Sequence, residues 1–155
     1  MDIQDRDHEF LARAIEQARI GRDEGGVPIG GALIADDGTV LAVGHNRRVQ
    51  QNSAIRHGET DALENGGRLP ASVYRHSTMY TTLSPCDMCT GAILLYGIPR
   101  VVIGENRTFV GGEDYLRARG VEVVNLDSDE CVELMREFIA AHPEIWNEDI
   151  GEEST

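Results

Sequence analysis

The chain has 155 residues, of which 41% are hydrophobic, so it can bury one core but is too short for two ordinary domains. We therefore expect a single domain over residues 1–155. The formal net charge is −13, from 27 acidic and 14 basic residues, and every one of those basic residues is arginine. Such a field repels phosphate backbones, so the composition disfavours a nucleic-acid partner.

The sequence contains no signal for a membrane or for export. No stretch approaches the roughly twenty apolar residues that span a bilayer, and the first ten residues are charged where a signal peptide would be apolar. We expect a cytoplasmic protein with no membrane partner. Three cysteines without a secretory signal favour metal binding or catalysis over a disulfide framework.

The first half of the chain predicts two helices and three strands. Apolar residues recur at helical spacing over 6–24, and two apolar runs over 29–46 flank Asp37-Gly38, which is a strong hairpin signal. A second helix is predicted over 54–64 and a β-rich strand over 77–83.

The second half alternates between helices and strands. The predicted elements are a helix over 86–96, a strand over 101–104, a short helix over 113–119, a strand over 121–124 and a helix over 128–141 with Ser128 as N-cap. Strand, helix and strand in succession imply parallel pairing. The order predicts an α/β protein, a three-layer α/β/α sandwich around a five-stranded mixed sheet.

Two short motifs carry the chemistry. His57 opens the second predicted helix, and Cys86 and Cys89 open the third. Cysteines three apart lie on one helix face, where the helix N-terminus favours thiolates. Two thiolates and one imidazole give Zn²⁺ three protein ligands and leave the fourth position for water, which is the arrangement of a catalytic site. We predict one catalytic zinc ion per chain.

Glu59 stands two residues from His57, within reach of a metal-bound water without binding the metal. His-x-Glu followed by Pro-Cys-x-x-Cys matches the signature of zinc deaminases that act on nucleobases. In such a site zinc lowers the pKa of its water toward neutrality, and Glu59 would pass the proton to the ring and then to the leaving amine. A lone Cys-x-x-Cys would also suit a redox pair or a zinc knuckle, but the upstream His-x-Glu favours catalytic zinc.

Longer segments around these motifs resemble the fungal-type cytosine deaminases of the cytidine deaminase-like superfamily. They are EGGVPIGGALI, GHN at 44–46, HGET at 57–60, LSPCDMCTGAI, YGIPRVVIGEN and the C-terminal W-x-E-D-I-G-E. The resemblance covers nearly the whole chain and implies the three-layer sandwich, a homodimer, and hydrolysis of cytosine to uracil and ammonia in pyrimidine salvage. The zinc motifs alone are shared with cytidine, guanine and tRNA-adenosine deaminases.

The resemblance also implies roles for individual residues. The zinc ligands are His57, Cys86 and Cys89, the proton shuttle is Glu59, and the substrate contacts are Asn46, Gly58, Ser84, Phe109, Trp146, Asp149, Ile150 and Ile29. Asn46 and the Gly58 N–H would bind the pyrimidine carbonyl edge, and Ser84 and Asp149 the amine. Phe109 and Trp146 would stack on or cap the ring, with residues 142–155 forming a lid and tail.

Three other functions remain open from the residues. The substrate could be another amino-heterocycle, such as isocytosine, 5-methylcytosine, creatinine or a triazine. A nucleoside or tRNA deaminase would share the zinc motifs but needs a pocket open to ribose or a basic channel. A non-catalytic zinc module would need a fourth protein ligand and no Glu59. Without the resemblance, Asn46 would read as a turn residue and Trp146 as core.

Overall fold

A five-stranded mixed sheet forms the centre of the protein, as predicted. The computed structural model describes residues 3–153, so the last two residues of the predicted segment 142–155 lie outside it. The strands run in the order β2-β1-β3-β4-β5. Their bounds are β1 Gly30–Ala35, β2 Val40–His45, β3 Ser77–Thr81, β4 Arg100–Ile103 and β5 Glu122–Asn125. β1 pairs antiparallel with β2 and β3, and β3, β4 and β5 pair in parallel.

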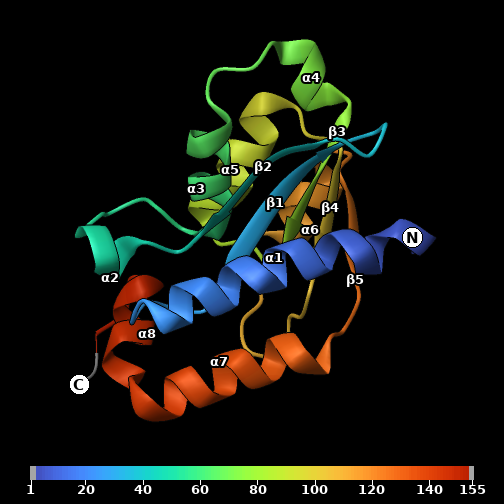
Figure 1. Ribbon diagram of the computed structural model, residues 1–155. Coiled ribbons are helices and arrows are strands. Elements are labelled where there is room, and N and C mark those ends of the chain that lie inside the picture. The colour runs from blue at the N-terminus through green and yellow to red at the C-terminus, as the bar shows by residue number, and fades with distance from the viewer. Residues whose placement is uncertain (1–2, 154–155) are drawn as a thin grey trace.

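Helices cover both faces of this sheet and make three layers (Figure 1). Their bounds are α1 Asp5–Asp23, α2 Arg48–Gln51, α3 Gly58–Gly66, α4 Ala71–Arg75, α5 Asp87–Tyr96, α6 Glu113–Ala118, α7 Asp129–Ala141 and α8 Pro143–Asp149. Helices α1 and α7 lie on one face, and α3 to α6 lie on the other. None of the helices within residues 3–153 combines the length and apolar character needed to cross a membrane.

Helix α1 packs closely on the sheet through its predicted apolar face. Phe10, Ala14 and Ala18 are buried in a cluster with the side chains of β1, β3, β4 and β5 that point toward this helix. A Cβ at Gly30 would lie 1.9 Å from the carbonyl oxygen of Ala14, so β1 can meet α1 only with glycine there.

The structure differs from the predicted elements in its short helices. Helices α2, α4 and α8 have four, five and seven residues, too few to show a helical period in sequence. The second long helix starts at Gly58 rather than at residue 54, because Ser53 Oγ accepts the N–H groups of Ile55 and Arg56 and holds them in a turn.

Three buried polar side chains join α1 to the centre of the sheet. Both oxygens of Asp7 accept from Arg100 at 2.8 Å, and Tyr80 donates to the same carboxyl group at 2.7 Å. Burial opposes ionisation of Asp7, but the hydrogen bonds from Arg100, Gln4 and Tyr80 hold its pKa below the usual 3.8. The fold therefore contains a buried ion pair in which both carboxylate oxygens accept hydrogen bonds.

We predict that Asp7→Asn lowers the free energy of unfolding at pH 7 by about 3 kcal/mol, because it breaks a buried ion pair. Since the pKa of Asp7 is lower in the folded state, its stabilisation is present above pH 4 and is lost as the pH falls through the folded pKa. Denaturant titrations at pH 7 and at pH 3 check this. The exposed Asp5→Asn is the control, and a deficit that is the same at both pH values contradicts the prediction.

Candidate active site

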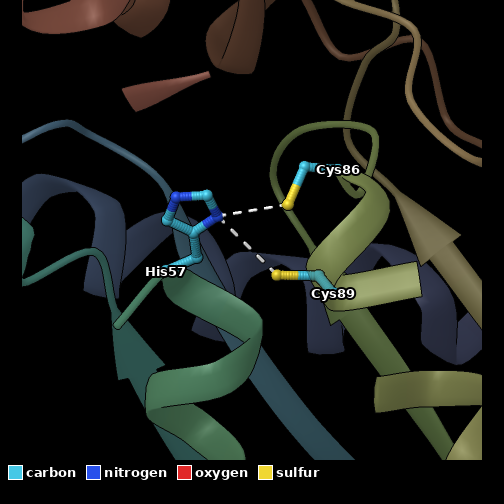
Figure 2. Close-up of side chains that lie close together, drawn as sticks. All are labelled: His57, Cys86 and Cys89. Atoms are coloured by element: carbon cyan, nitrogen blue, oxygen red, sulfur yellow. Dashed lines mark hydrogen bonds between the residues drawn. The ribbon is translucent and has the colours of Figure 1, made fainter. Parts of the chain in front are cut away.

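The N-termini of α3 and α5 bring the three predicted ligands together (Figure 2). His57 is the N-cap of α3 and Cys86 is the N-cap of α5, with Cys89 one turn further along. The Nδ1 atom of His57 lies 3.3 Å from Sγ of Cys86 and 3.8 Å from Sγ of Cys89. Among the described residues, this is the group of histidine, cysteine and acidic side chains whose ligand atoms lie within 4.8 Å of one another.

These separations fit tetrahedral zinc. With ordinary Zn–N and Zn–S bonds, the nitrogen and sulfur ligands of one ion lie about 3.6 Å apart. The two observed distances lie on either side of that value. Two cysteines and one histidine are also a donor set that zinc prefers, so the residues present fit a zinc ion with one open position.

The three ligands strongly perturb one another. A hydrogen bond from Cys89 and the neighbouring His57 lower the pKa of Cys86 to about 4. Burial alone would lower the pKa of His57, but Cys86 and the charges of Asp149 and Glu59 raise it to about 9. A bound cation favours the deprotonated form of each ligand, so metal binding here would release protons.

Glu59 lies in the first turn of α3, beside the ligand cluster and nearly excluded from solvent. Burial raises its pKa to about 7, with a further contribution from the charge of Cys86 and an opposing one from His57. A carboxyl group with a pKa near neutrality can both accept and deliver a proton. Such a carboxyl group beside a metal site is suited to general acid–base catalysis.

The carboxyl group of Asp149 stands behind the histidine ligand. It lies 3.5 Å from Nε2 of His57, the ring nitrogen that faces away from the cysteines. Asn46 donates to both oxygens of Asp149 at 3.0 and 3.1 Å, and Arg48 lies 3.4 Å from one of them. A carboxylate on the second nitrogen of a zinc-binding histidine fixes the tautomer and the ring orientation.

A small pocket opens onto Glu59 and onto two of the ligands, His57 and Cys86. It is lined by Ile29, His57, Glu59, Leu83, Ser84, Cys86, Phe109, Trp146, Asp149 and Ile150. Apolar side chains with a few polar groups among them are the usual lining of a small-molecule site.

The structure thus brings most of the predicted substrate contacts to one place. Two of the predicted substrate contacts, Asn46 and Gly58, do not line the pocket. Asn46 is fully buried behind Asp149, and Gly58 is the first residue of α3. Leu83 is a lining residue that the sequence analysis did not select. Its position directly before Ser84 in the second motif was the available signal.

Comparison with known proteins agrees with this geometry. The model of the cytidine and deoxycytidylate deaminase zinc-binding region matches residues 4–105, a range that contains all three ligands and Glu59. This chain belongs to that family. The membership makes it a zinc-binding deaminase, an enzyme that hydrolyses a carbon–nitrogen bond.

Relatives within this deaminase family act on different substrates. A cytosine deaminase of Candida albicans is 58% identical over 146 residues, which cover 94% of this chain and 97% of that protein. A tRNA-specific adenosine deaminase of Streptococcus pyogenes is 36% identical over 109 residues, covering 69% and 67%. The solved structure of guanine deaminase from Nitrosomonas europaea has a TM-score of 0.67 at 24% identity, covers 84% of this chain and 83% of that chain, and supports the fold alone.

We predict that the purified protein carries about one zinc ion per chain and that Cys89→Ser loses most of it, because a serine hydroxyl is a poor zinc ligand. Inductively coupled plasma mass spectrometry after dialysis measures the content. Cys131→Ser is the matched control, since Cys131 is also buried but lies outside the ligand cluster. Equal loss in both variants would point to unfolding rather than to a lost ligand.

Proposed function

We propose that this protein deaminates free cytosine to uracil and ammonia, and so returns cytosine to pyrimidine salvage. The observation that carries the proposal is the small pocket that opens onto Glu59, His57 and Cys86, with Cys89 completing the ligand cluster behind them. The 58% identity to a cytosine deaminase over nearly the whole chain supports the choice of ring.

The residues of this chain divide the work of the reaction. Bound zinc would supply a Lewis acid that activates water. Glu59 takes a proton from the water that adds to the amine-bearing carbon and delivers it to the ring nitrogen. It then moves the second proton, from the new hydroxyl group on that carbon, to the leaving amine, and the hydroxyl group becomes the carbonyl of uracil. The carbon–nitrogen bond breaks and ammonia leaves.

The walls of the pocket favour a free base over a nucleotide in RNA. Phe109 and Trp146 meet edge to face, with ring centroids 6.1 Å apart, and Trp146 belongs to α8. Arg48 holds α8 in place through two 2.8 Å hydrogen bonds to the carboxyl group of Glu148. A covered pocket and a net charge of −13 both disfavour a polyanionic substrate.

Ammonia release from a panel of amines tests this assignment. The panel is cytosine, cytidine, isocytosine, adenine, guanine and creatinine, and we expect turnover of cytosine alone. We expect Glu59→Gln to keep its zinc and to lose activity by about 10² to 10⁴-fold, because the proton shuttle is gone. Turnover of another compound of the panel instead of cytosine would change the assigned substrate but keep the reaction. Zinc binding without ammonia release from any of them would contradict the proposed function.

We also propose that residues 142–155, of which the structure describes 142–153, form a lid segment and tail. Trp146→Ala should raise KM for cytosine by about tenfold and change zinc content little, because it removes a buried ring from the pocket wall and not a ligand. Steady-state kinetics measure the effect. Glu144→Gln, on the exposed side of α8, is the control and should leave KM unchanged.

A homodimer is a further part of the proposal, and an apolar surface supports it. Ile55, Leu95 and Tyr96 are 62%, 75% and 43% exposed, and all three line one hollow beside α3, α4 and α5. Contiguous exposed apolar side chains of this size commonly mark a protein interface. A twofold dimer would bury the same patch on both copies.

We predict that Leu95→Arg shifts the protein toward the monomer in analytical ultracentrifugation, because it places a charge in the buried patch. Ile20→Arg, on α1 in the opposite layer, should leave the mass unchanged. A dimer that survives Leu95→Arg would place the interface elsewhere.

We also propose that the chain is one domain and works in the cytoplasm. Two core clusters share the one sheet, and a third joins α7 and α8 to the strand ends, which supports a single domain. Cys86, Cys89 and Cys131 are all free, which fits a reducing compartment.

A further inference from the structure

Another buried carboxyl group lies behind the pocket wall, beside Ser84. Glu113 begins α6 and is only 3% exposed. Its Oε2 atom accepts a hydrogen bond from the Ser84 hydroxyl at 2.6 Å, and Ser84 lines the pocket. A hydrogen bond this short is typical of a hydroxyl that donates to a carboxylate.

The direction of this hydrogen bond is fixed by a chain of neighbours. The backbone N–H of Asp127 donates to Oδ1 of Asn125, and Nδ2 of Asn125 donates to Oδ1 of Asn106. Nδ2 of Asn106 therefore faces Glu113 and donates to Oε1 at 3.3 Å. Arg117 also lies 3.6 Å from Oε1, so the other polar neighbours of this carboxyl group are donors, and it acts as the acceptor toward Ser84.

The Ser84 hydroxyl has one proton, and that proton is directed at Glu113. Its oxygen also accepts the backbone N–H of Gly111 at 2.9 Å, which leaves one lone pair. Toward the pocket, the hydroxyl can therefore only accept a hydrogen bond. It would suit a ring that presents an N–H donor at this wall and would disfavour one that presents a carbonyl oxygen.

The same contacts tie the Phe109 loop to the zinc motif. The N–H of Gly112 donates to the carbonyl oxygen of Pro85 at 3.0 Å. A Cβ at Gly111 would lie 1.8 Å from that oxygen, so the two backbones approach as only glycine allows. The backbone directly after Ser84 is therefore fixed against the Phe109 loop.

We propose that Glu113 is a specificity-determining positioning residue: by accepting the hydroxyl proton of Ser84, it makes that hydroxyl an acceptor for the exocyclic amine of the substrate. The inference rests on the proposed deamination of cytosine and names a residue that sets the preference for an amine. Glu113 itself does not contact the ring.

Glu113→Gln tests this directly. The new glutamine amide can take two orientations. If its nitrogen points toward Asn106, two hydrogen-bond donors face each other. If its nitrogen points toward Ser84, the Ser84 hydroxyl must turn its proton toward the pocket. The donors of Asn106 and Arg117 disfavour the first orientation, and in the second the hydroxyl no longer presents an acceptor to the amine. The substitution changes one atom type and preserves the volume, so it separates the direction of the hydrogen bond from packing.

The measurement is ligand affinity in the Glu59→Gln background, where cytosine binds without turnover. Calorimetric titrations compare cytosine with pyrimidin-2-one, the same ring without the amine. We expect Glu113→Gln to weaken cytosine by about threefold to tenfold, the value of one hydrogen bond, and to leave pyrimidin-2-one unchanged. Asp114→Asn, fully exposed in the same turn of α6, should change neither affinity.

Equal weakening of both ligands, or no change in either, overturns the proposal and leaves Glu113 with a purely structural role. If Glu113→Gln does not fold, Ser84→Ala carries the test, because it removes the acceptor itself and should produce the same selective loss. When both variants fold, Glu113→Gln should add nothing to Ser84→Ala. If the parent protein neither binds nor deaminates cytosine, the proposed function fails and this inference fails with it, whereas activity on cytosine without selectivity sinks the inference alone.

Discussion

The position of the active site depends on how closely α3 approaches the sheet. A Cβ at Gly31 would lie 2.7 Å from the carbonyl oxygen of Gly58, and one at Gly44 would lie 2.4 Å from the backbone nitrogen of Ala62. These glycines allow the helix backbone to rest directly on β1 and β2. His57 caps this helix, so its imidazole is placed by backbone contact rather than by flexible side chains. Helix α5 follows β3 after a short loop, and this places the cysteines at its N-terminus beside the histidine.

Buried carboxyl groups hold the segments around that centre, and arginine is their usual partner. Asp61, fully buried on α3, accepts from Arg47 at 2.9 Å and pairs with Arg56 at 2.7 Å. These bonds anchor the segment between β2 and α3, and that segment begins with Asn46. A planar guanidinium can hold two acceptors at fixed angles, which a lysine ammonium cannot do. A chain whose 14 basic residues are all arginine can therefore carry a large acidic excess and still fix its loops.

The sequence predicted the parts of the structure that depend on local pattern. The helix expected over 6–24 is found at Asp5–Asp23, and the ligand set followed from the spacing of the two motifs and their helix N-termini. Pairings between distant segments were not predictable in this way. Ser84 and Glu113 are 29 residues apart, and Asn46 and Asp149 are 103 apart, so periodicity carries no trace of either pair. Helix α8 escaped prediction for another reason: its seven residues, of which the first is a proline, are too few to show a helical repeat.

The residues that line the pocket come from two parts of the chain, before and after residue 105. The part that the family model matches, residues 4–105, holds the three ligands and Glu59, which any hydrolytic deaminase of this kind needs. Phe109, Trp146, Asp149 and Ile150 lie beyond it, yet all four line the same pocket. Relatives that share the first part and differ in the second can therefore keep one reaction and change its substrate. Residues after 105 complete the wall of this pocket, and two of them contact the first part of the chain: Gly111 donates its N–H to Ser84, and Asp149 lies 3.5 Å from His57.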